Sequence, residues 1–353
     1  MTPTASSSPG STRLGRPSDP QDATRTMPPR PSSSRRFMSS TSPRTRASFP
    51  AIIDYFRQVD LRAAVDSLTG LSVGDALGAP FEMHPPFEDG AVFAPPPPPW
   101  RWTDDTEMAC TLLEGVRRDG RVDQHWLAAA FAQRWSADRG YGRGSVSLLS
   151  SIRDGVPWQT ASAALFSGRG SSGNGAAMRV APLGAFFADD PDVAVRQAAL
   201  SAEVTHRHPE GISGAVAVAL ASSLTARHTP RESLLRMVLN QLPPSDVRDG
   251  IGRAVRMSEK ADPRDVAADL GNGSHALAQD TVPFALWVAA THLDDYPRAM
   301  EACVQAGGDT DSMCAIAGGI IAAHTGIGDD PGRGTIGVPP QWIDHREPLP
   351  TWS

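Results

Sequence analysis

The sequence predicts an all-α fold, because three features recur along most of its length. From residue 51 onward, apolar residues are spaced three or four positions apart, which places them on one face of a helix. Alternating β-branched runs of strand length are nearly absent. Segments 215–221 and 317–323 are rich in small residues. Because Gly in a helix costs up to ~1 kcal/mol relative to Ala, Gly318 and Gly319 suggest that two helices approach closely.

Two helical stripes are the clearest, over 108–116 and 313–321, where apolar residues recur at helical intervals. Similar patterns predict further helices over 61–77, 123–136, 145–153, 191–203, 211–226, 230–240, 245–259 and 281–292. The Pro-rich segment 94–99 indicates an exposed connector of polyproline character. Nothing between 51 and 340 resembles a linker or a repeat, so we expect one helical domain over 51–345.

Residues 1–48 differ in composition from the rest of the chain. They are rich in Ser, Thr and Pro and contain eight Arg against two Asp, a charge of about +6. This segment cannot bury enough apolar surface to offset its ordering entropy, so we expect a disordered tail. Its composition also suits an organelle transit peptide, the alternative being a dispensable extension or a misassigned start.

Charge and cysteine content narrow the class of protein. The whole chain has a net charge of −6, so residues 49–353 carry about −12, which argues against general nucleic-acid binding. No run of 18 apolar residues predicts a membrane span, and the tail lacks the apolar core of a secretory signal. Cys110, Cys303 and Cys314 are few and odd in number, as expected for reduced, buried thiols in a cytoplasmic protein.

Two acidic clusters about 200 residues apart each place two carboxylates and hydroxyls within a few positions before an apolar helical pattern. Ligands made only of oxygen suit hard divalent cations such as Mg²⁺, and neither cluster contains the His or Cys that favours zinc. Four carboxylates held together need about two such cations. The clusters therefore predict a two-metal site with ligands drawn from Thr103, Asp104, Asp105, Asp309, Asp311 and Ser312.

The same residues also suit simple helix capping, which is the alternative interpretation. Thr103 is expected to cap the helix that follows it, and Asp311 or Ser312 to cap the helix that runs to about residue 323. The two glycines before Asp309 favour a site, because they allow a sharp turn and a close approach to a ligand. Two such clusters are more than capping requires.

Ordered motifs over roughly 60–340 resemble the ADP-ribosylglycohydrolase family. The resemblance rests on 70–82 (Gly-Leu-Ser-Val-Gly-Asp-Ala-Leu-Gly-Ala-Pro-Phe-Glu), 103–106 (Thr-Asp-Asp-Thr), 141–144 (Tyr-Gly-Arg-Gly), 173–179 (Gly-Asn-Gly-Ala-Ala-Met-Arg), 205–209 (Thr-His-Arg-His-Pro) and 308–312 (Gly-Asp-Thr-Asp-Ser). Ser312 departs from it, because Thr is usual there, but Ser keeps the hydroxyl. The Pro-rich insertion and the tail lie outside the pattern.

The resemblance implies a single compact orthogonal helical domain around a binuclear centre of two Mg²⁺ ions, with Mn²⁺ in some members. It implies hydrolysis that releases ADP-ribose from a modified protein side chain or a related ADP-ribosyl compound. The six oxygen-bearing residues named above match the family's metal ligands. Asp311 is our choice for a carboxylate that bridges both ions, and Asp105 and Asp311 would stabilise an oxocarbenium-like state. Glu82 matches an acidic residue at the metal edge that could switch as a ligand or act on a proton.

The remaining motifs supply the expected substrate contacts. Backbone N–H groups of a Gly-rich turn suit a diphosphate, and a ring or imidazole nearby suits the rest of the ligand. The expected residues are Tyr141, Gly142, Gly144, Gly173, Asn174, Gly175, Met178 and His206. Arg143 and Arg179 are candidates to neutralise phosphate, although an isolated Arg is more commonly structural. His206 is as often a cap or a core residue, and Asp75 suits either a ligand contact or a cap.

Two other functions compete with the hydrolase. One is a non-catalytic ADP-ribose-binding or structural relative on the same fold, against which all six apparent ligand positions keep their oxygen. The other is a Mg²⁺-dependent phosphohydrolase that uses the Asp-x-Asp of 309–311. Such enzymes place an aspartyl nucleophile after a β-strand, and no strand pattern precedes Asp309.

Overall fold

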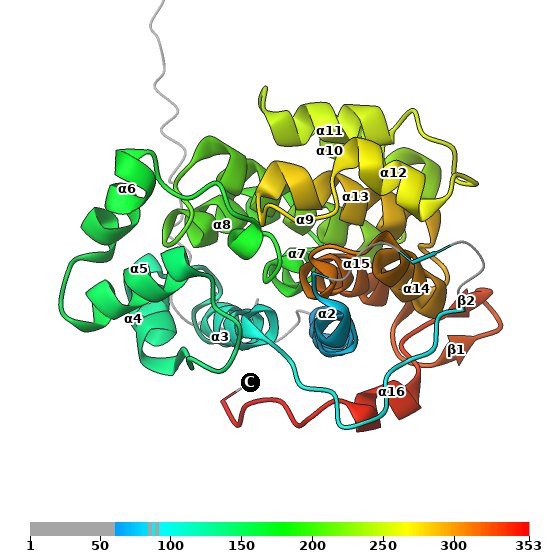
Figure 1. Cartoon of the computed structure of the whole chain (residues 1–353), viewed down its shortest axis with the longest axis horizontal. Helices are drawn as coiled ribbons and strands as arrows, with labels where there is room; N and C mark the ends of the chain where they lie inside the picture. The colour runs from blue at the N-terminus through cyan, green and yellow to red at the C-terminus, as the bar shows by residue number, and fades with distance from the viewer. Residues whose placement is uncertain (1–60, 84–86, 89–91, 353) are drawn as a thin grey trace, which may run out of the picture. The chain divides into compact units, whose positions relative to one another are not determined.

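The structure, a computed structural model, describes residues 61–83, 87–88 and 92–352. These residues lie within one unit, Phe49–Ser353, and their regular secondary structure is almost entirely helical, as predicted (Figure 1). The expected disordered tail, 1–48, falls outside the described residues. None of the described helices is both long and apolar enough to cross a membrane.

The helices, in chain order, are α2 (Arg62–Gly78), α3 (Asp104–Asp119), α4 (Gln124–Arg134), α5 (Arg143–Arg153), α6 (Trp158–Gly168), α7 (Ala181–Phe186), α8 (Pro191–Glu203), α9 (Pro209–Ala226), α10 (Arg231–Gln241), α11 (Asp246–Ala254), α12 (Pro263–Leu270), α13 (Ala278–Thr291), α14 (Tyr296–Ala306), α15 (Thr310–Thr325) and α16 (Pro340–His345). Short 3₁₀ helices are η1 (Ala79–Phe81) and η2 (Asn174–Ala176). The two-residue strands β1 (Asp329–Asp330) and β2 (Thr335–Ile336) pair antiparallel, with Asp329 opposite Ile336.

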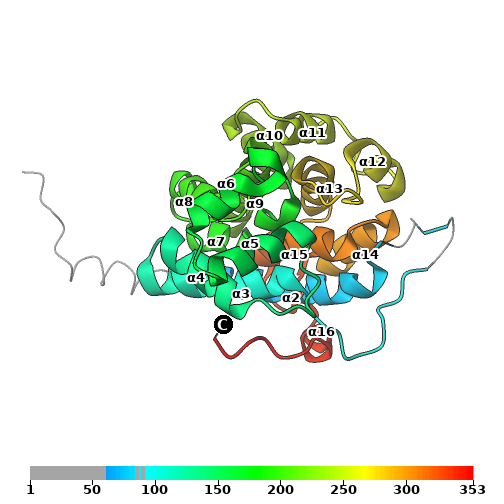
Figure 2. The ribbon, with the colours of Figure 1, turned by 60° about the vertical axis from the view of Figure 1, so that its left-hand side comes forward.

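Helices α2 and α15 lie side by side among the other helices (Figures 1 and 2). A Cβ added to Gly74 would lie only 2.3 Å from the carbonyl oxygen of Cys314. Gly70 and Gly78, one turn away on either side, are also too close to α15 to carry a side chain, and a Cβ on Gly318 would lie 2.7 Å from Gly70 O. The predicted close approach at Gly318 is therefore confirmed.

The pair is antiparallel, because Gly70 faces Gly318 whereas Gly78 faces Thr310. The hydroxyl of Thr310 donates to Gly78 O over 2.9 Å, and that of Tyr296 donates to Gly70 O over 2.6 Å. The last turn of α2 thus lies beside the first turn of α15. This contact brings the segment after α2, with Glu82, to the start of α15.

The second cluster starts its helix earlier than predicted. Helix α15 begins at Thr310, with Asp309 at the N-cap position and no side-chain cap hydrogen bond. Asp311 and Ser312 therefore lie in the first turn, and the expectation that either of them caps the helix was wrong. The hydrogen bond from Thr310 to α2 fixes the start of the helix two or three residues earlier, so neither side chain occupies the cap position. Thr103, by contrast, caps α3 as predicted.

Most helices match the predicted ranges, but 245–259 was too long, since α11 ends at Ala254. Five helices were not predicted: α6, α7, α12, α14 and α16. They have at most 11 residues, and all but α6 begin with Pro at their first or second position. Proline is favoured there because its missing N–H needs no partner, yet in a sequence it also marks a break.

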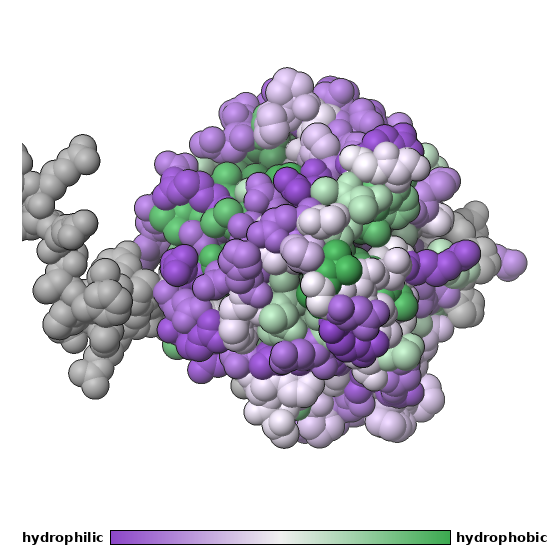
Figure 3. Space-filling view, turned by 90° about the vertical axis from the view of Figure 1, so that its left-hand side faces the viewer, coloured by the Kyte–Doolittle hydropathy of each residue, from purple (hydrophilic) through white to green (hydrophobic). Residues whose placement is uncertain are grey.

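The face formed by α4, α5 and α6 is mostly hydrophilic, with hydrophobic areas between (Figure 3). Among the described residues from α4 to α6, Val156 and Phe166 are the large apolar side chains that are exposed. Phe166 and Ser167 depart from helical geometry at the end of α6, with φ of 50° and 60°. Such values are rare for side-chain-bearing residues.

Candidate active site

A cavity of about 460 Å³ opens where α3 and α15 begin, facing the loops after α4, after α6 and before α13. Its volume lies in the range of small-molecule sites. Most of the predicted site residues line it together: Glu82, Asp104, Asp105, Gly142, Gly144, Gly173, Asn174, Gly175, Met178, His206, Asp309, Asp311 and Ser312. The two acidic clusters thus line the same cavity.

A tight turn presents Asp309 to the cavity. Gly307 and Gly308 have φ of 64° and 81°, which only glycine adopts readily. A Cβ on Gly308 would also lie 2.3 Å from Asn272 O, the atom that accepts the N–H of Asp309 over 2.9 Å. The Asn174 side chain then donates to Asp309 Oδ2 over 2.7 Å. The substrate-side loop and the second acidic cluster are therefore joined directly.

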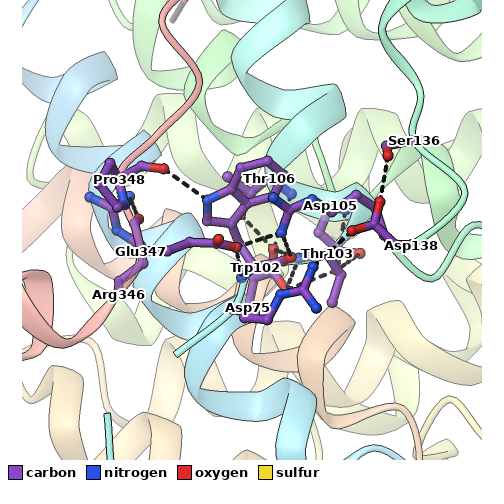
Figure 4. A network of polar contacts seen from close by, with 12 residues as sticks. Asp75, Trp102, Thr103, Asp105, Thr106, Ser136, Asp138, Arg346, Glu347 and Pro348 are labelled. Atoms are coloured by element: carbon purple, nitrogen blue, oxygen red, sulfur yellow. Dashed lines mark hydrogen bonds and ion pairs between the residues drawn. The ribbon is translucent and has the colours of Figure 1, made fainter. Parts of the chain in front are cut away.

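Asp75, whose role was left open, holds the first cluster in place (Figure 4). It is fully buried in α2 and accepts the backbone N–H and hydroxyl of Thr103, the hydroxyl over 2.8 Å, together with the N–H of Thr106 over 3.1 Å. Burial outweighs these bonds and raises its pKa to about 6. Asp75 thus caps the start of α3 from a neighbouring helix.

The carboxylates of the two clusters repel one another. Burial, and then Asp75, raise the pKa of Asp104 and Asp105 well above the usual range. Burial and Asp309 do the same to the pKa of Asp311. Among the described residues that line the cavity, Arg169 is the only Lys or Arg. Bound cations would relieve this repulsion.

The chemistry of the donor set fits divalent cations. Asp105 Oδ1 is buried and has no hydrogen-bond partner among the described residues, so it needs a donor or a cation. As the side chains stand, no group of three His, Cys, Asp or Glu within the described ranges surrounds one point closely enough to hold an ion. The six-residue ligand set, with its hydroxyls, therefore remains a prediction.

Glu82 follows η1 and lines the cavity. The backbone N–H of Met83 donates to Gly308 O over 2.7 Å, which ties this segment to the turn before Asp309. Partial burial, and then Asp309, raise the pKa of Glu82. A carboxyl group with a raised pKa beside other acids is suited to hold or release a proton.

The ring of His206 packs against the Gly-rich loop at 173–175. A Cβ on Gly175 would lie 2.8 Å from its ring, and one on Gly173 would lie 3.2 Å away. Its Nδ1 lies 2.7 Å from the Thr205 hydroxyl, which accepts a hydrogen bond from Arg179 over 3.0 Å. Arg179 is fully buried and also donates to Gly175 O. It does not line the cavity, so its role here is structural.

The contribution of His206 to stability should be lost in acid, whereas the buried acids with raised pKa values act in the opposite direction. Burial, and then Arg179, lower its pKa from 6.5 to about 3. Between pH 6.5 and about 3, His206 binds a proton in the unfolded chain but stays neutral in the folded chain. This group therefore lowers the free energy of unfolding by up to about 1.4 kcal/mol for each pH unit of acidification. In urea denaturation across this window, acidification should therefore be less destabilising for His206→Asn than for the wild type. Parallel changes in the two proteins would contradict this prediction.

Thr103, Tyr141 and the phosphate candidate Arg143 do not line the cavity. The Thr103 hydroxyl bonds to Asp75 and lies 3.2 Å from Asp105 Oδ2, just behind the cavity wall. Tyr141 is buried, and its hydroxyl donates to Glu107 over 2.8 Å. It anchors the segment that carries Gly142 and leads into α5, where Gly144 lies, so its visible role is to hold that segment.

Several lining residues were not predicted: Phe166, Arg169, Ser171, Ser172, His208 and His275. Phe166 lies against the start of α5, since a Cβ on Gly144 would lie 3.3 Å from its ring. It reaches this position through the turn at the end of α6. The sequence carries no clear signal for that turn, because neither Phe166 nor Ser167 is a usual residue for positive φ.

Comparisons with known proteins agree with this site. Residues 57–351 match the ADP-ribosylglycohydrolase family. An uncharacterized protein of Archaeoglobus fulgidus is 31% identical over 293 residues, covering 78% of this chain and 89% of that protein. ADP-ribosylhydrolase ARH3 is 28% identical in both Gallus gallus, covering 79% of this chain and 88% of that protein, and Homo sapiens, covering 75% and 85%.

The fold also matches a solved structure described as an ADP-ribosylglycohydrolase-related protein complex. The TM-score is 0.60 at 26% identity, and the match covers 81% of this chain and 93% of that one. The match to the family spans nearly all of the described helices. The chain therefore belongs to the ADP-ribosylglycohydrolase family of glycosidic-bond hydrolases.

Proposed function

We propose that this protein is a Mg²⁺-dependent hydrolase that releases ADP-ribose from a modified protein side chain or a related small ADP-ribosyl compound. The observation that carries the proposal is the meeting of two acidic clusters with the Gly-rich loops around one cavity. Two ions would be held by Thr103, Asp104, Asp105, Asp309, Asp311 and Ser312, with Mn²⁺ as the alternative metal. Bound there, they would orient ribose hydroxyls and lower the pKa of a water.

The chain's own carboxylates account for the rest of the chemistry. Cleavage of a glycosidic bond builds positive charge on the sugar, and Asp105 and Asp311 supply negative charge beside it. Glu82 holds a proton more readily than an ordinary Glu, because burial and Asp309 raise its pKa. We assign Glu82 the proton transfer at the leaving atom.

The loops hold and orient the ligand, although some of the backbone N–H groups expected to bind the diphosphate already have partners within the protein. The N–H of Gly173 donates to Ser171 Oγ and that of Asn174 to Ala276 O, so neither is available for a diphosphate. The Asn174 side chain is likewise bonded to Asp309 and Thr281. We assign Asn174 to positioning Asp309, and Gly142, Gly144, Gly175 and Met178 to ligand contact.

Of the other functions, a phosphohydrolase has least support. Asp309 follows helix α14 and a glycine turn, where such an enzyme has a strand before its aspartyl nucleophile. A non-catalytic binding protein could have the same fold, but it would not need several mutually repelling carboxylates around the cavity.

The free thiols Cys110, Cys303 and Cys314 support a cytoplasmic location.

A panel of ADP-ribosyl substrates tests this function. Arg-linked, Ser-linked and O-acetyl-linked ADP-ribose are each incubated with the purified full chain in Mg²⁺ or in EDTA, and free ADP-ribose is measured. We expect at least one substrate to be hydrolysed, with activity lost in EDTA and restored by Mg²⁺. Tight ADP-ribose binding without turnover would favour the binding protein instead, and turnover that resists EDTA would overturn the metal requirement.

A further inference from the structure

A second polar cavity, of about 450 Å³, lies at the other end of α15. It is separated from the acidic cavity by about 20 Å of helix, and the proposed reaction uses none of its residues. Helices α9 and α15 end beside it, α2 begins there, and the Gly-rich turn 326–333 covers it. Its most unusual feature is a pair of imidazoles, His228 and His324.

The contacts of His324 fix where its proton lies. Its Nε2 is 3.1 Å from Asp294 Oδ1, and because a carboxylate only accepts, this nitrogen donates. Its Nδ1 lies 3.3 Å from His228 Nδ1 and 3.3 Å from Thr225 O. In the neutral ring this Nδ1 is a lone pair, and it faces a backbone carbonyl that also only accepts.

The contacts of His228 point the same way. Arg333 lies 2.9 Å from His228 Nδ1, and because a guanidinium only donates, this nitrogen is a lone pair. The two Nδ1 atoms therefore lie 3.3 Å apart beside Thr225 O, and the donor at this point is the guanidinium of Arg333 on His228. A cation that took the place of this guanidinium hydrogen could accept both lone pairs.

We propose that His228 and His324 bind one divalent transition-metal ion of the zinc class through their Nδ1 atoms. An ion with Zn–N bonds of 2.0–2.1 Å holds two tetrahedral ligands about 3.4 Å apart. The observed separation of the two nitrogens is 3.3 Å. Imidazole nitrogen suits this class of ion, whereas the acidic cavity offers the oxygen that Mg²⁺ prefers.

The surroundings favour such an ion. Asp294 accepts a hydrogen bond from Nε2 of His324, and hydrogen bonds of this kind orient metal-binding imidazoles in proteins. The C-terminal ends of α9 and α15 carry partial negative charge, and Asp329 and Asp330 line the cavity. His228 has a φ of 57°, a strained value that is common at functional sites.

The site would be open and exchangeable. No third His, Cys, Asp or Glu completes the ligand set among the described residues, so water would fill the remaining positions. Arg333 competes for His228 Nδ1, because its guanidinium donates to the lone pair that an ion would use. Removing Arg333 should therefore strengthen metal binding, an effect that a purely structural role of the histidines would not produce.

Zinc titration of the full chain tests the proposal. The protein is stripped with chelator, supplied with excess Mg²⁺ and titrated with Zn²⁺ by calorimetry, and Cu²⁺ electron paramagnetic resonance reports nitrogen ligands. We expect one Zn²⁺ per chain, weakened at least ~100-fold in His324→Ala and His228→Asn and about tenfold in Asp294→Asn. Asn is chosen at 228 because it tolerates positive φ. Arg333→Ala should bind several-fold more tightly, and His125→Ala, which alters an exposed imidazole elsewhere, should match the wild type.

The proposal would be overturned if the wild type bound no zinc under excess Mg²⁺, or if both histidine variants bound zinc as tightly as the wild type. Arg333→Ala keeps both ligands, so it decides the matter even where a histidine variant fails to fold. Zinc binding that is unchanged or weaker in Arg333→Ala would also count against the site. None of these results depends on hydrolysis, so the proposed function is tested separately.

Discussion

Asp311→Asn is expected to lower turnover by roughly 10³-fold, about 4 kcal/mol of barrier, while the chain stays folded. Asp311 is our bridging ligand, and an amide is a poor ligand for Mg²⁺. Asn keeps the size of the side chain and an oxygen that can accept the N–H of Ser312, a bond of 2.9 Å. Steady-state kinetics with a substrate found in the panel would measure the loss.

The same variant should separate the site from the fold. Without metal, Asp311→Asn should be at least as stable as the wild type, because it removes a carboxyl whose own pKa is raised by burial and by the repulsion of Asp309 and Asp105. Mg²⁺ should raise the melting temperature of the wild type and not that of the variant.

Asp189→Asn provides the control for this experiment, since it makes the same exchange at an exposed position. It should keep both the activity and the Mg²⁺ response. An Asp311→Asn enzyme that retains more than about a tenth of wild-type turnover would contradict the assignment.

Gly74→Ala is expected to destabilise the fold strongly, by about 3 kcal/mol or more. The added Cβ would meet Cys314 O at 2.3 Å, a contact with backbone that no side-chain rotation relieves. Relief requires α2 and α15 to separate, which would also move Asp75 and the start of α15. We therefore expect weaker Mg²⁺ binding in whatever fraction still folds, measured by urea denaturation and calorimetry.

Gly252→Ala is the matched control, because it also places a methyl on a helical glycine. The Cβ there would meet only Leu239, at 3.8 Å, so the change should be neutral or should stabilise by up to ~1 kcal/mol. If the two variants unfolded at the same urea concentration, the close packing of α2 on α15 would not be the feature that holds the site together.

The fold class and the close helix pair were predictable because both depend on local pattern. Gly318 and Gly319 would weaken a solitary helix, so their presence indicated a partner. The capping of α3 was predictable for the same reason, since Thr103 and the acids after it are near neighbours in sequence. The start of α15 was misplaced because the bond that fixes it runs from Thr310 to Gly78, 232 residues away.

The parts of the site that were missed depend on distant contacts. Asp75 was left undecided between a ligand and a cap, and the Thr103 hydroxyl that settles this lies 28 residues away. Phe166 and Arg169 enter the cavity only because the end of α6 leaves helical geometry. Asn174 was expected to face the ligand, and the fold instead gives it Asp309 as its partner.

Diffraction from crystals grown in Mn²⁺, recorded at the manganese absorption edge, tests most directly whether the two clusters share a pair of ions. The account predicts two anomalous peaks ~3.5 to 4 Å apart, between the carboxylates of Asp104 and Asp105 on one side and those of Asp309 and Asp311 on the other. A single peak remote from these residues, or no peak in a protein that still hydrolyses its substrate, would contradict it.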